Sequence, residues 1–302
     1  MKAMSADPDT PPDMTPDTTP AAGQGMDTAF VLGGGGLLGA HEVGMLRALD
    51  EAGVKPDLVV GTSVGALNGV VLAADPADAV ARLTSLWGSD VVRTAFAGSW
   101  MTRLSTLARS GTHLHSPEPL RDLLARTLPV SRIEELAVPF QCVAASVEHA
   151  RAHWFTEGPL VEAVLASCAV PGLLPPVRVG GGHFLDGGLV HSIPVGRAVA
   201  LGARRVYVLH VGRIERPLTV PRRPWEVGLT AFEIARRHRF AEEMAALPEG
   251  VEVHVMPAGA ETRPGVDLSQ LRYRDSSQIS GHIERAYEAS SRYLAQRPSG
   301  SP

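Results

Sequence analysis

The sequence has few cysteines and no long apolar run. Its two cysteines, Cys142 and Cys168, cannot form a disulfide framework or a four-cysteine zinc site, so they fit a reducing compartment or simple core packing. No stretch approaches the ~18 uninterrupted apolar residues of a membrane-spanning helix. Neither sign of charge dominates, because 28 Lys and Arg against 32 Asp and Glu leave a net charge of −4. This balance argues against a nucleic-acid partner.

The chain does contain enough apolar residues, 44%, for a sizeable core. Residues 1–26 differ from the rest because they are rich in Pro, Asp and Thr and lack apolar periodicity. They also lack the basic and apolar regions of a secretory signal, which favours a cytoplasmic location. We therefore expect disordered tails at 1–26 and 298–302 and one domain over 27–297.

Short β-branched runs alternate with helical patterns along this domain. The expected strands lie at 29–32, 58–60, 140–147, 206–211 and 251–256. Helical patterns follow the first two strands and recur at 160–168, 193–201, 229–246 and 276–294. Because strands that alternate with helices pair in parallel, the sequence predicts an α/β fold. It is a three-layer α/β/α sandwich with a mainly parallel central sheet, to which residues 177–185 add a hairpin.

A glycine loop, Gly33-Gly34-Gly35-Gly36-Leu37-Leu38-Gly39, lies between the first strand and the first helix. Its backbone N–H groups and the helix dipole favour negative charge, so it predicts an anion site, with a plain tight turn as the alternative. Gly34-x-Gly36-x-x-Gly39 also matches the dinucleotide-binding fingerprint. However, the second strand ends in Val59-Val60-Gly61, without the acidic residue that would hold a ribose.

The second strand leads into Gly61-Thr62-Ser63-Val64-Gly65, which fits the pattern G-x-S-x-G between a strand and a helix. A serine on such a sharp turn has its Oγ exposed above the sheet, and the flanking glycines remove Cβ clashes. The alternative is that Ser63 is an ordinary helix N-cap.

A third motif, Leu185-Asp186-Gly187-Gly188, ends the expected hairpin and by itself is a plain Asp-Gly turn. Glycine loop, serine elbow and Asp-Gly-Gly in this order resemble the patatin-like phospholipases. The segments Gly44–Leu49 and Ala166–Pro176 also match that family's pattern, and the resemblance is close over residues 29–210.

The resemblance implies a catalytic dyad without histidine, in which Ser63 is the nucleophile and Asp186 is the base. It also implies that the backbone N–H groups of Gly34, Gly35 and Gly36 form the oxyanion hole. The glycines that support these motifs are Gly39, Gly61, Gly65, Gly187 and Gly188. The implied activity is that of a serine acyl hydrolase, of lipase or phospholipase A type, that cleaves carboxylic ester bonds of lipids.

No cofactor and no metal are expected. The expected partners are a lipid or ester substrate and, transiently, a membrane surface, whereas the oligomeric state stays open. One departure concerns charge: the chain has Leu38 where the family usually has Arg or Lys. Glu42 likewise takes the position of a histidine, and His41 lies one place early.

Two other functions stay open. An α/β-hydrolase triad would take its histidine from the four that follow Asp186, namely His191, His210, His254 and His282. Against a triad, the elbow of that fold comes several strands later. His210 and His254 also lie in strand patterns, and we expect His282 to face solvent. The other function is a non-catalytic module, either nucleotide-binding or an inactive lipid-binding relative. The missing acidic residue counts against nucleotide binding. Substitutions at Ser63 or Asp186 would have suggested an inactive relative, but both residues are present.

Three further segments have plainer explanations. Residues 87–114 are less regular than their surroundings and form either a lid or an interfacial patch over the active site, with a helix packed on the sheet as the default. The basic clusters 222–223 and 236–239 could touch an anionic membrane, with solvated helix faces as the default. His113 and His115 could share one strand face, but no third metal ligand is evident nearby.

Overall fold

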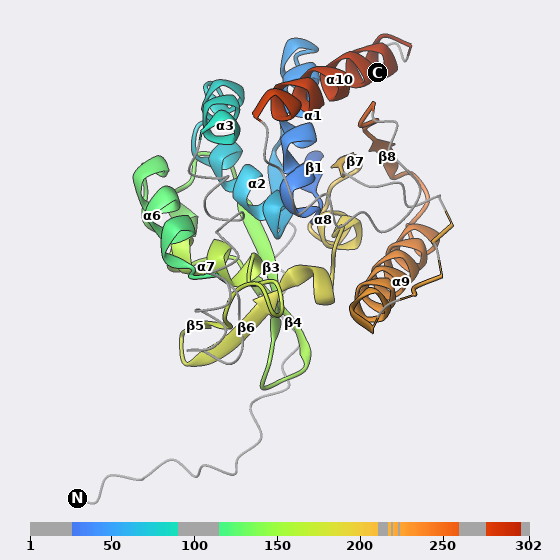
Figure 1. The fold of residues 1–302 in the computed structure, drawn as a ribbon. Helices are drawn as coiled ribbons and strands as arrows, with labels where there is room; N and C mark the ends of the chain where they lie inside the picture. The colour runs from blue at the N-terminus through green and yellow to red at the C-terminus, as the bar shows by residue number, and fades with distance from the viewer. Residues whose placement is uncertain are drawn as a thin grey trace, which may run out of the picture.

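The protein is described from a computed structural model (Figure 1). The described residues are 26–89, 115–210, 217–218, 220–222, 224–259 and 276–296. The predicted tails 1–26 and 298–302, apart from Met26, lie outside these residues. Of the segment 87–114, residues 90–114, and with them His113, lie outside them as well.

Eight strands form a single sheet in the order β5-β6-β3-β2-β1-β7-β8, and β4 also pairs with β3. The strands are β1 (Thr28–Leu32), β2 (Leu58–Thr62), β3 (Phe140–Ser146), β4 (Arg151–Phe155), β5 (Val177–Val179), β6 (Gly182–Asp186), β7 (Arg205–Leu209) and β8 (Glu252–Val255). The neighbours β3, β2, β1, β7 and β8 pair in parallel. The contacts of β4, β5 and β6 are antiparallel. The prediction of a mainly parallel sheet is therefore confirmed.

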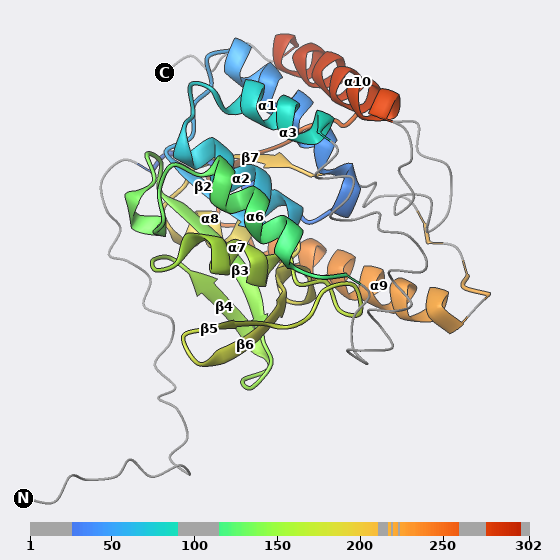
Figure 2. The same cartoon turned by 60° about the vertical axis from the view of Figure 1, so that its left-hand side comes forward.

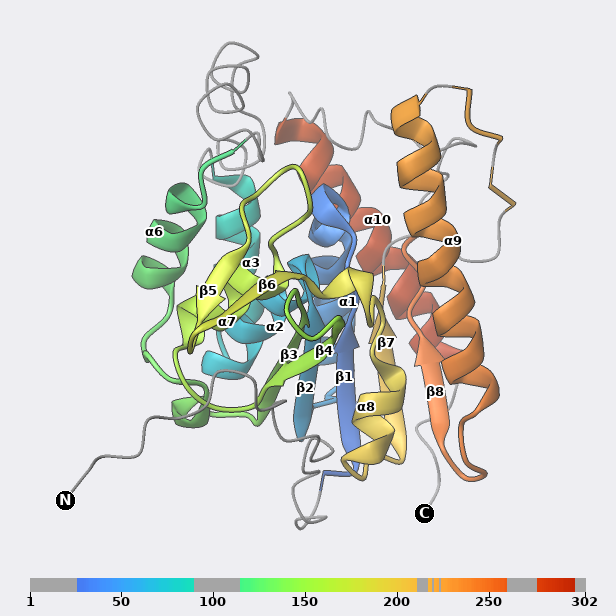
Figure 3. The ribbon, with the colours of Figure 1, turned by 90° about the horizontal axis from the view of Figure 1, so that it is seen from below.

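Helices cover both faces of this sheet. They are α1 (Ala40–Glu51), α2 (Val64–Ala74), α3 (Ala79–Gly88), α6 (Glu118–Thr127), α7 (Leu160–Ser167), α8 (Val195–Ala200), α9 (Pro224–Ala245) and α10 (Ser276–Ala295). Short 3-10 turns lie at η1 (Gly36–Gly39), η2 (Ile133–Glu135) and η3 (Gly187–Leu189). Seen from below, α8 and α9 lie in front of the central strands, and α1 and α10 lie behind them (Figure 3). The turned view in Figure 2 shows the same three layers, as predicted.

The alternation of side chains along β1 explains why two layers of helices are needed. Phe30 and Leu32 belong to one buried cluster, together with residues of α1, α2, α3, α7 and α10. Ala29 and Val31 belong to a second cluster, on the side of α8 and α9. Successive strand residues point to opposite faces, so an unbroken apolar run requires cover on both sides.

The register of the central strands brings the motifs to one edge of the sheet. Leu32 at the end of β1 pairs with Gly61 in β2 and with Leu209 at the end of β7. The chain continues this pattern one residue further, where the Gly33 N–H donates to the Leu209 carbonyl at 2.9 Å. The glycine loop and the serine elbow therefore leave the sheet side by side at its carboxyl edge.

Three elements were not expected from the sequence: β4, α3 and α6. β4 alternates exposed and partly covered residues, and its Arg151 and His153 are exposed. In the sheet β4 pairs with β3 alone, so it is an edge strand. It has no continuous apolar run of the kind that predicts the central strands. None of the helices among the described residues is long and apolar enough to cross a membrane.

Candidate active site

The elbow holds Ser63 in a strained backbone conformation between β2 and α2. Its φ is +55° and its ψ is −125°, in a region that non-glycine residues rarely adopt. The flanking glycines permit this turn, because a Cβ on Gly61 would lie 2.6 Å from the Ala66 Cα. A Cβ on Gly65 would lie 2.2 Å from the carbonyl oxygen of Leu32. Both glycines of the motif are therefore required by close backbone contact.

Ser63 and Asp186 lie in direct contact although 123 residues separate them. The Ser63 Oγ donates a hydrogen bond of 2.6 Å to the Asp186 Oδ2. Both side chains are buried, with 8% of Ser63 and 3% of Asp186 exposed. Ser63 makes no side-chain capping bond to α2, so its hydroxyl is directed to the carboxylate and not to the helix.

The Asp-Gly-Gly motif positions the carboxylate. Asp186 is the last residue of β6 and pairs with Ala144 of β3. Its Oδ1 accepts a hydrogen bond of 2.7 Å from the Gly188 N–H. A Cβ on Gly187 would lie 2.1 Å from the Val143 carbonyl oxygen, so only glycine fits there. The motif is thus more than a turn, because each of its glycines has a separate structural role.

Burial raises the pKa of Asp186 from 3.8 to about 6, although the hydrogen bonds from Ser63 and Gly188 act in the opposite direction. Burial dominates because a carboxylate loses solvation in the protein interior. At neutral pH Asp186 is therefore ionised, but it is a stronger proton acceptor than an exposed aspartate. Such a carboxylate suits the role of a base towards a bound hydroxyl.

The backbone of Ser63 is fixed by α7, a contact that the sequence did not indicate. The Ser63 N–H donates to the Ser167 Oγ at 2.9 Å, and the Cys168 thiol donates to the Ser63 carbonyl at 3.1 Å. Burial raises the pKa of Cys168, so it stays a thiol and a donor. The only sequence signal for this contact was that the segment 166–176 matches the family's pattern. That match did not show that the segment holds the backbone of Ser63.

The glycine loop lies against Ser63. A Cβ on Gly34 would lie 3.5 Å from the Ser63 Cβ, which shows how closely the two chains approach. The Gly34 N–H, however, donates to the Ser192 carbonyl at 2.9 Å. The prediction that Gly34 is an oxyanion donor is therefore corrected, because its proton is already engaged. Gly35 and Gly36 remain as candidates, and Gly36 has a φ of +58° that suits glycine.

Comparison with known proteins matches the part of the chain that holds these motifs. A family model described as "Patatin-like phospholipase" matches residues 30–199, which include the loop, Ser63 and Asp186. The chain belongs to the patatin-like phospholipase family.

Individual relatives are similar to about two thirds of the chain. "Lysophospholipase NTE1" of Phaeosphaeria nodorum is 33% identical over 192 residues, which cover 63% of this chain and 12% of that protein. "Patatin-like phospholipase domain-containing protein ZK370.4" of Caenorhabditis elegans is 35% identical over 204 residues, which cover 63% of this chain and 14% of that protein. The chain thus matches only a small part of these relatives. Among solved structures, VipD from Legionella pneumophila aligns with a TM-score of 0.43 at 15% identity, covering 90% of this chain and 67% of that one.

Two departures from the patatin-like family pattern have a structural basis. Leu38 is buried, so its side chain contributes apolar contact and no charge. Glu42 is fully buried and accepts a hydrogen bond of 2.7 Å from the Asn68 Nδ2, which also donates to the Gly39 carbonyl at 3.0 Å. Burial raises the pKa of Glu42 well above its usual value. Through Asn68 this carboxyl helps to hold the end of the glycine loop.

A histidine triad does not fit this site, because the direct contact between Ser63 and Asp186 leaves no place for an imidazole between them. The Nδ1 atoms of His191 and His254 lie 2.6 Å from the Glu243 Oε1 and 3.3 Å from the Tyr293 hydroxyl, respectively.

The other two histidines of the predicted set also have partners away from Ser63 and Asp186. The His210 Nε2 lies 3.2 Å from Arg236. The expectation that His282 faces solvent is wrong. It is half-buried where α10 packs on α1, and its Nδ1 lies 3.0 Å from the His41 Nε2.

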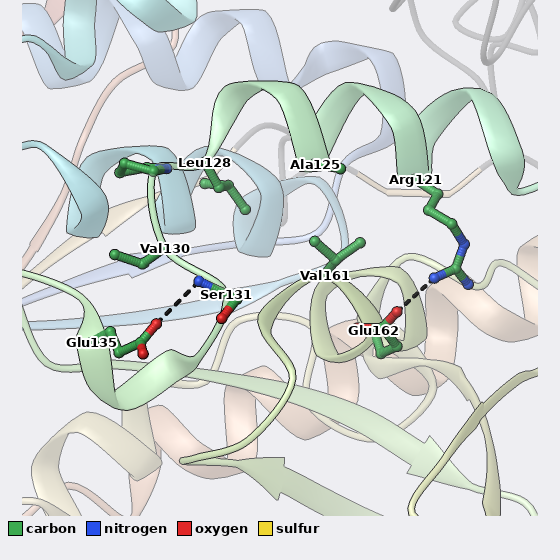
Figure 4. A pocket seen from close by; sticks show the side chains of 9 residues that line it. Arg121, Ala125, Leu128, Val130, Ser131, Glu135, Val161 and Glu162 are labelled. Atoms are coloured by element: carbon green, nitrogen blue, oxygen red, sulfur yellow. Dashed lines mark hydrogen bonds and ion pairs between the residues drawn. The ribbon is translucent and has the colours of Figure 1, made fainter.

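A separate pocket of about 860 Å³ lies between α6 and α7 (Figure 4). Its walls include Leu128, Val161 and the ion pair of Arg121 with Glu162, in which the nitrogen and oxygen are 2.6 Å apart. None of the predicted site residues lines it. Within the described parts of the chain, no group of three or more His, Cys, Asp or Glu side chains is arranged to hold a metal ion.

Proposed function

We propose that the chain is a serine acyl hydrolase that cleaves carboxylic ester bonds of lipids. The observation that carries this proposal is the 2.6 Å hydrogen bond from the Ser63 Oγ to Asp186, made within a buried and strained elbow. An alcohol is a poor nucleophile until an adjacent base accepts its proton. Asp186, with its pKa raised to about 6, is such a base and is still ionised at neutral pH.

The reaction begins when the Ser63 Oγ attacks the ester carbonyl carbon and its proton passes to the Asp186 Oδ2. The carbonyl oxygen becomes an oxyanion, which the N–H groups of Gly35 and Gly36 stabilise. Collapse of this intermediate breaks the ester C–O bond, and the departing alcohol takes the proton from Asp186. Water then attacks the acyl-serine with Asp186 again as base, which releases the fatty acid and restores the Ser63 hydroxyl.

We propose phospholipids or lysophospholipids as the substrate class, since matched relatives carry the name lysophospholipase. Transient contact with a lipid surface is part of this proposal. Val227 and Ile234 lie two turns apart on the same face of α9 and are 54% and 55% exposed. Leu189 is also exposed and lies three residues after Asp186. These three side chains are the surface that we assign to the membrane.

The nucleophile is tested by labelling with a fluorophosphonate probe, which reacts with activated serines. The wild type should be labelled at Ser63, as located by mass spectrometry of the modified peptide. Ser63→Ala should abolish labelling and Asp186→Asn should slow it strongly, whereas the control Ser131→Ala should be labelled at the wild-type rate. A label on another serine, or labelling that persists in Ser63→Ala, would overturn the proposal.

The lipid surface is tested by sedimentation with phosphatidylcholine vesicles. The double variant V227S/I234S should bind vesicles less tightly and keep its rate on a water-soluble ester. Val255→Ser is a matched control, because Val255 is also an exposed apolar residue but lies in β8. Equal vesicle binding by wild type, double variant and control would exclude this face of α9.

A further inference from the structure

Helix α9 carries a guanidinium, that of Arg236, that is largely buried. Only 10% of the Arg236 side chain is exposed. Its Nε and Nη2 donate to the two carboxylate oxygens of Glu233 at 2.8 and 2.7 Å. This two-point contact fixes the plane of the guanidinium, which leaves Nη1 as its remaining nitrogen. The expectation of a solvated helix face at 236–239 is therefore wrong for Arg236.

The remaining nitrogen contacts two residues of the sheet edge. The Arg236 Nη1 lies 3.2 Å from the His210 Nε2 and 3.5 Å from the Ser192 Oγ. Burial lowers the pKa of His210 well below its usual value, and Arg236 and Arg237 act in the same direction. His210 is therefore neutral. Because Arg236 donates to its Nε2, the proton of the imidazole lies on Nδ1.

His210 and Ser192 both pack against the start of the glycine loop. The His210 Nδ1 is buried, has no hydrogen-bond partner among the described residues, and lies 2.7 Å from the place of a Cβ on Gly33. The Ser192 carbonyl accepts the Gly34 N–H at 2.9 Å. The Ser192 Oγ lies 3.5 Å from the place of a Cβ on Gly34. Both contacts of Arg236 thus lead to the residues directly before Gly35 and Gly36.

A run of four glycines has little conformational preference of its own, so its shape must come from its neighbours. Oxyanion donors act only when they lie ~2.7–3.1 Å from the developing charge. We propose that Arg236 is a positioning residue for the acyl transfer: through Ser192 and His210 it sets the path of the glycine loop and hence the direction of the Gly35 and Gly36 N–H groups. This inference rests on the function proposed for Ser63 and Asp186.

The shape of the guanidinium and its charge can be separated by two substitutions. Arg236→Lys keeps the positive charge but cannot contact Glu233, His210 and Ser192 at once. Arg236→Gln removes the charge as well. Positioning requires that both variants lose activity, whereas a purely electrostatic effect would leave Arg236→Lys active. Arg239→Gln is the matched control, because Arg239 is an exposed arginine of the same helix.

The experiment measures kcat and KM for p-nitrophenyl butyrate together with fluorophosphonate labelling of Ser63. Both Arg236 variants should lose about 10²-fold in kcat, the scale expected for a misplaced catalytic group, with KM within about twofold of wild type. The pH at which kcat/KM is half-maximal should not move, because Asp186 is unchanged. Arg239→Gln should match the wild type. Circular dichroism confirms that each variant is folded.

An Arg236→Lys variant with wild-type kcat would overturn the inference, and so would a rise in KM at constant kcat. If both Arg236 variants are unfolded, Ser192→Ala and His210→Asn are measured instead, since each removes one of the two contacts of Arg236. Each should lower kcat at nearly constant KM, and a wild-type kcat in both would overturn the inference. A wild type that neither hydrolyses the ester nor labels at Ser63 contradicts the proposed function itself. If hydrolysis by the wild type depends on Ser63 but the Arg236 variants are fully active, only the positioning role of Arg236 is contradicted.

Discussion

The raised pKa of Asp186 predicts an acid limb in the activity. Burial moves the pKa from 3.8 to about 6, a shift of about two units that favours the protonated carboxyl by about 3 kcal/mol. Only the carboxylate can accept the Ser63 proton. At pH 5 about one-tenth of the molecules should therefore be competent, so kcat/KM should fall about tenfold between pH 7 and pH 5. An aspartate of ordinary pKa would leave the rate almost constant over this range.

The assay is the initial rate of hydrolysis of a water-soluble ester between pH 4.5 and 8, at substrate concentrations far below KM, so that kcat/KM of the free enzyme is obtained. Circular dichroism at each pH confirms that the protein stays folded. A flat profile between pH 7 and pH 5 would refute the assignment of Asp186 as a buried base. So would an inflection near pH 6 that persists in the residual activity of Asp186→Asn, because another group would then be titrating.

Three other predictions concern stability. Gly65→Ala places a Cβ 2.2 Å from the Leu32 carbonyl oxygen. This substitution should lower the free energy of unfolding, measured by urea titration, by about 2 kcal/mol or more. In the control Gly88→Ala the new Cβ has no atom within 4 Å, so the free energy of unfolding should change little. Because the folded-state pKa of Glu42 is raised, the contribution of this carboxyl to stability should decline as pH rises above about 4.5. Glu42→Gln should remove that part of the difference in the free energy of unfolding between pH 5 and pH 8; an unchanged difference would contradict the raised pKa. Burial lowers the pKa of His41 to about 4, so the contribution of this histidine to stability should fall as the pH drops from 6.5 towards 4. His41→Gln should remove this contribution, which amounts to at most about 3 kcal/mol. An equal change with pH in variant and wild type would exclude His41 as its source.

The central strands were predictable because their signal is local. β1 contains the apolar run 29–32 and β2 contains the apolar run 58–60, and such runs are typical of parallel strands covered on both faces. Glycine clusters directly after them indicated sharp turns. By contrast, the edge strand β4 has exposed residues such as Arg151, and its pairing with β3 depends on the turn between them. No periodicity in the sequence distinguishes it from a loop.

The contact between Ser63 and Asp186 could be expected only from the family resemblance. Nothing in the spacing of two residues 123 positions apart indicates that they meet. The physical reason appears in the sheet, where antiparallel pairing of β6 with β3 brings Asp186 next to the carboxyl end of β2. The sequence also could not show which N–H of the glycine loop is already engaged, because that depends on Ser192 from a distant turn.

The sequence was least informative for charged and polar side chains whose environment is set by packing between helices. His282 looks like a surface residue on α10, yet α10 lies on α1 and brings it to His41. Arg236 likewise belongs to a basic cluster that suggests solvent, yet it lies against Ser192 and His210. In both cases the residue type indicates a surface position and the tertiary contact overrides it.

The most direct test of the central claim is hydrolysis of p-nitrophenyl butyrate and longer-chain esters by the wild type beside Ser63→Ala. The wild type should release p-nitrophenol, and Ser63→Ala should reduce the rate to background while its circular dichroism spectrum stays that of the wild type. Hydrolysis by Ser63→Ala at the wild-type rate would contradict the assignment of Ser63 as the nucleophile. So would a wild type that is inactive on every chain length, with and without phospholipid vesicles.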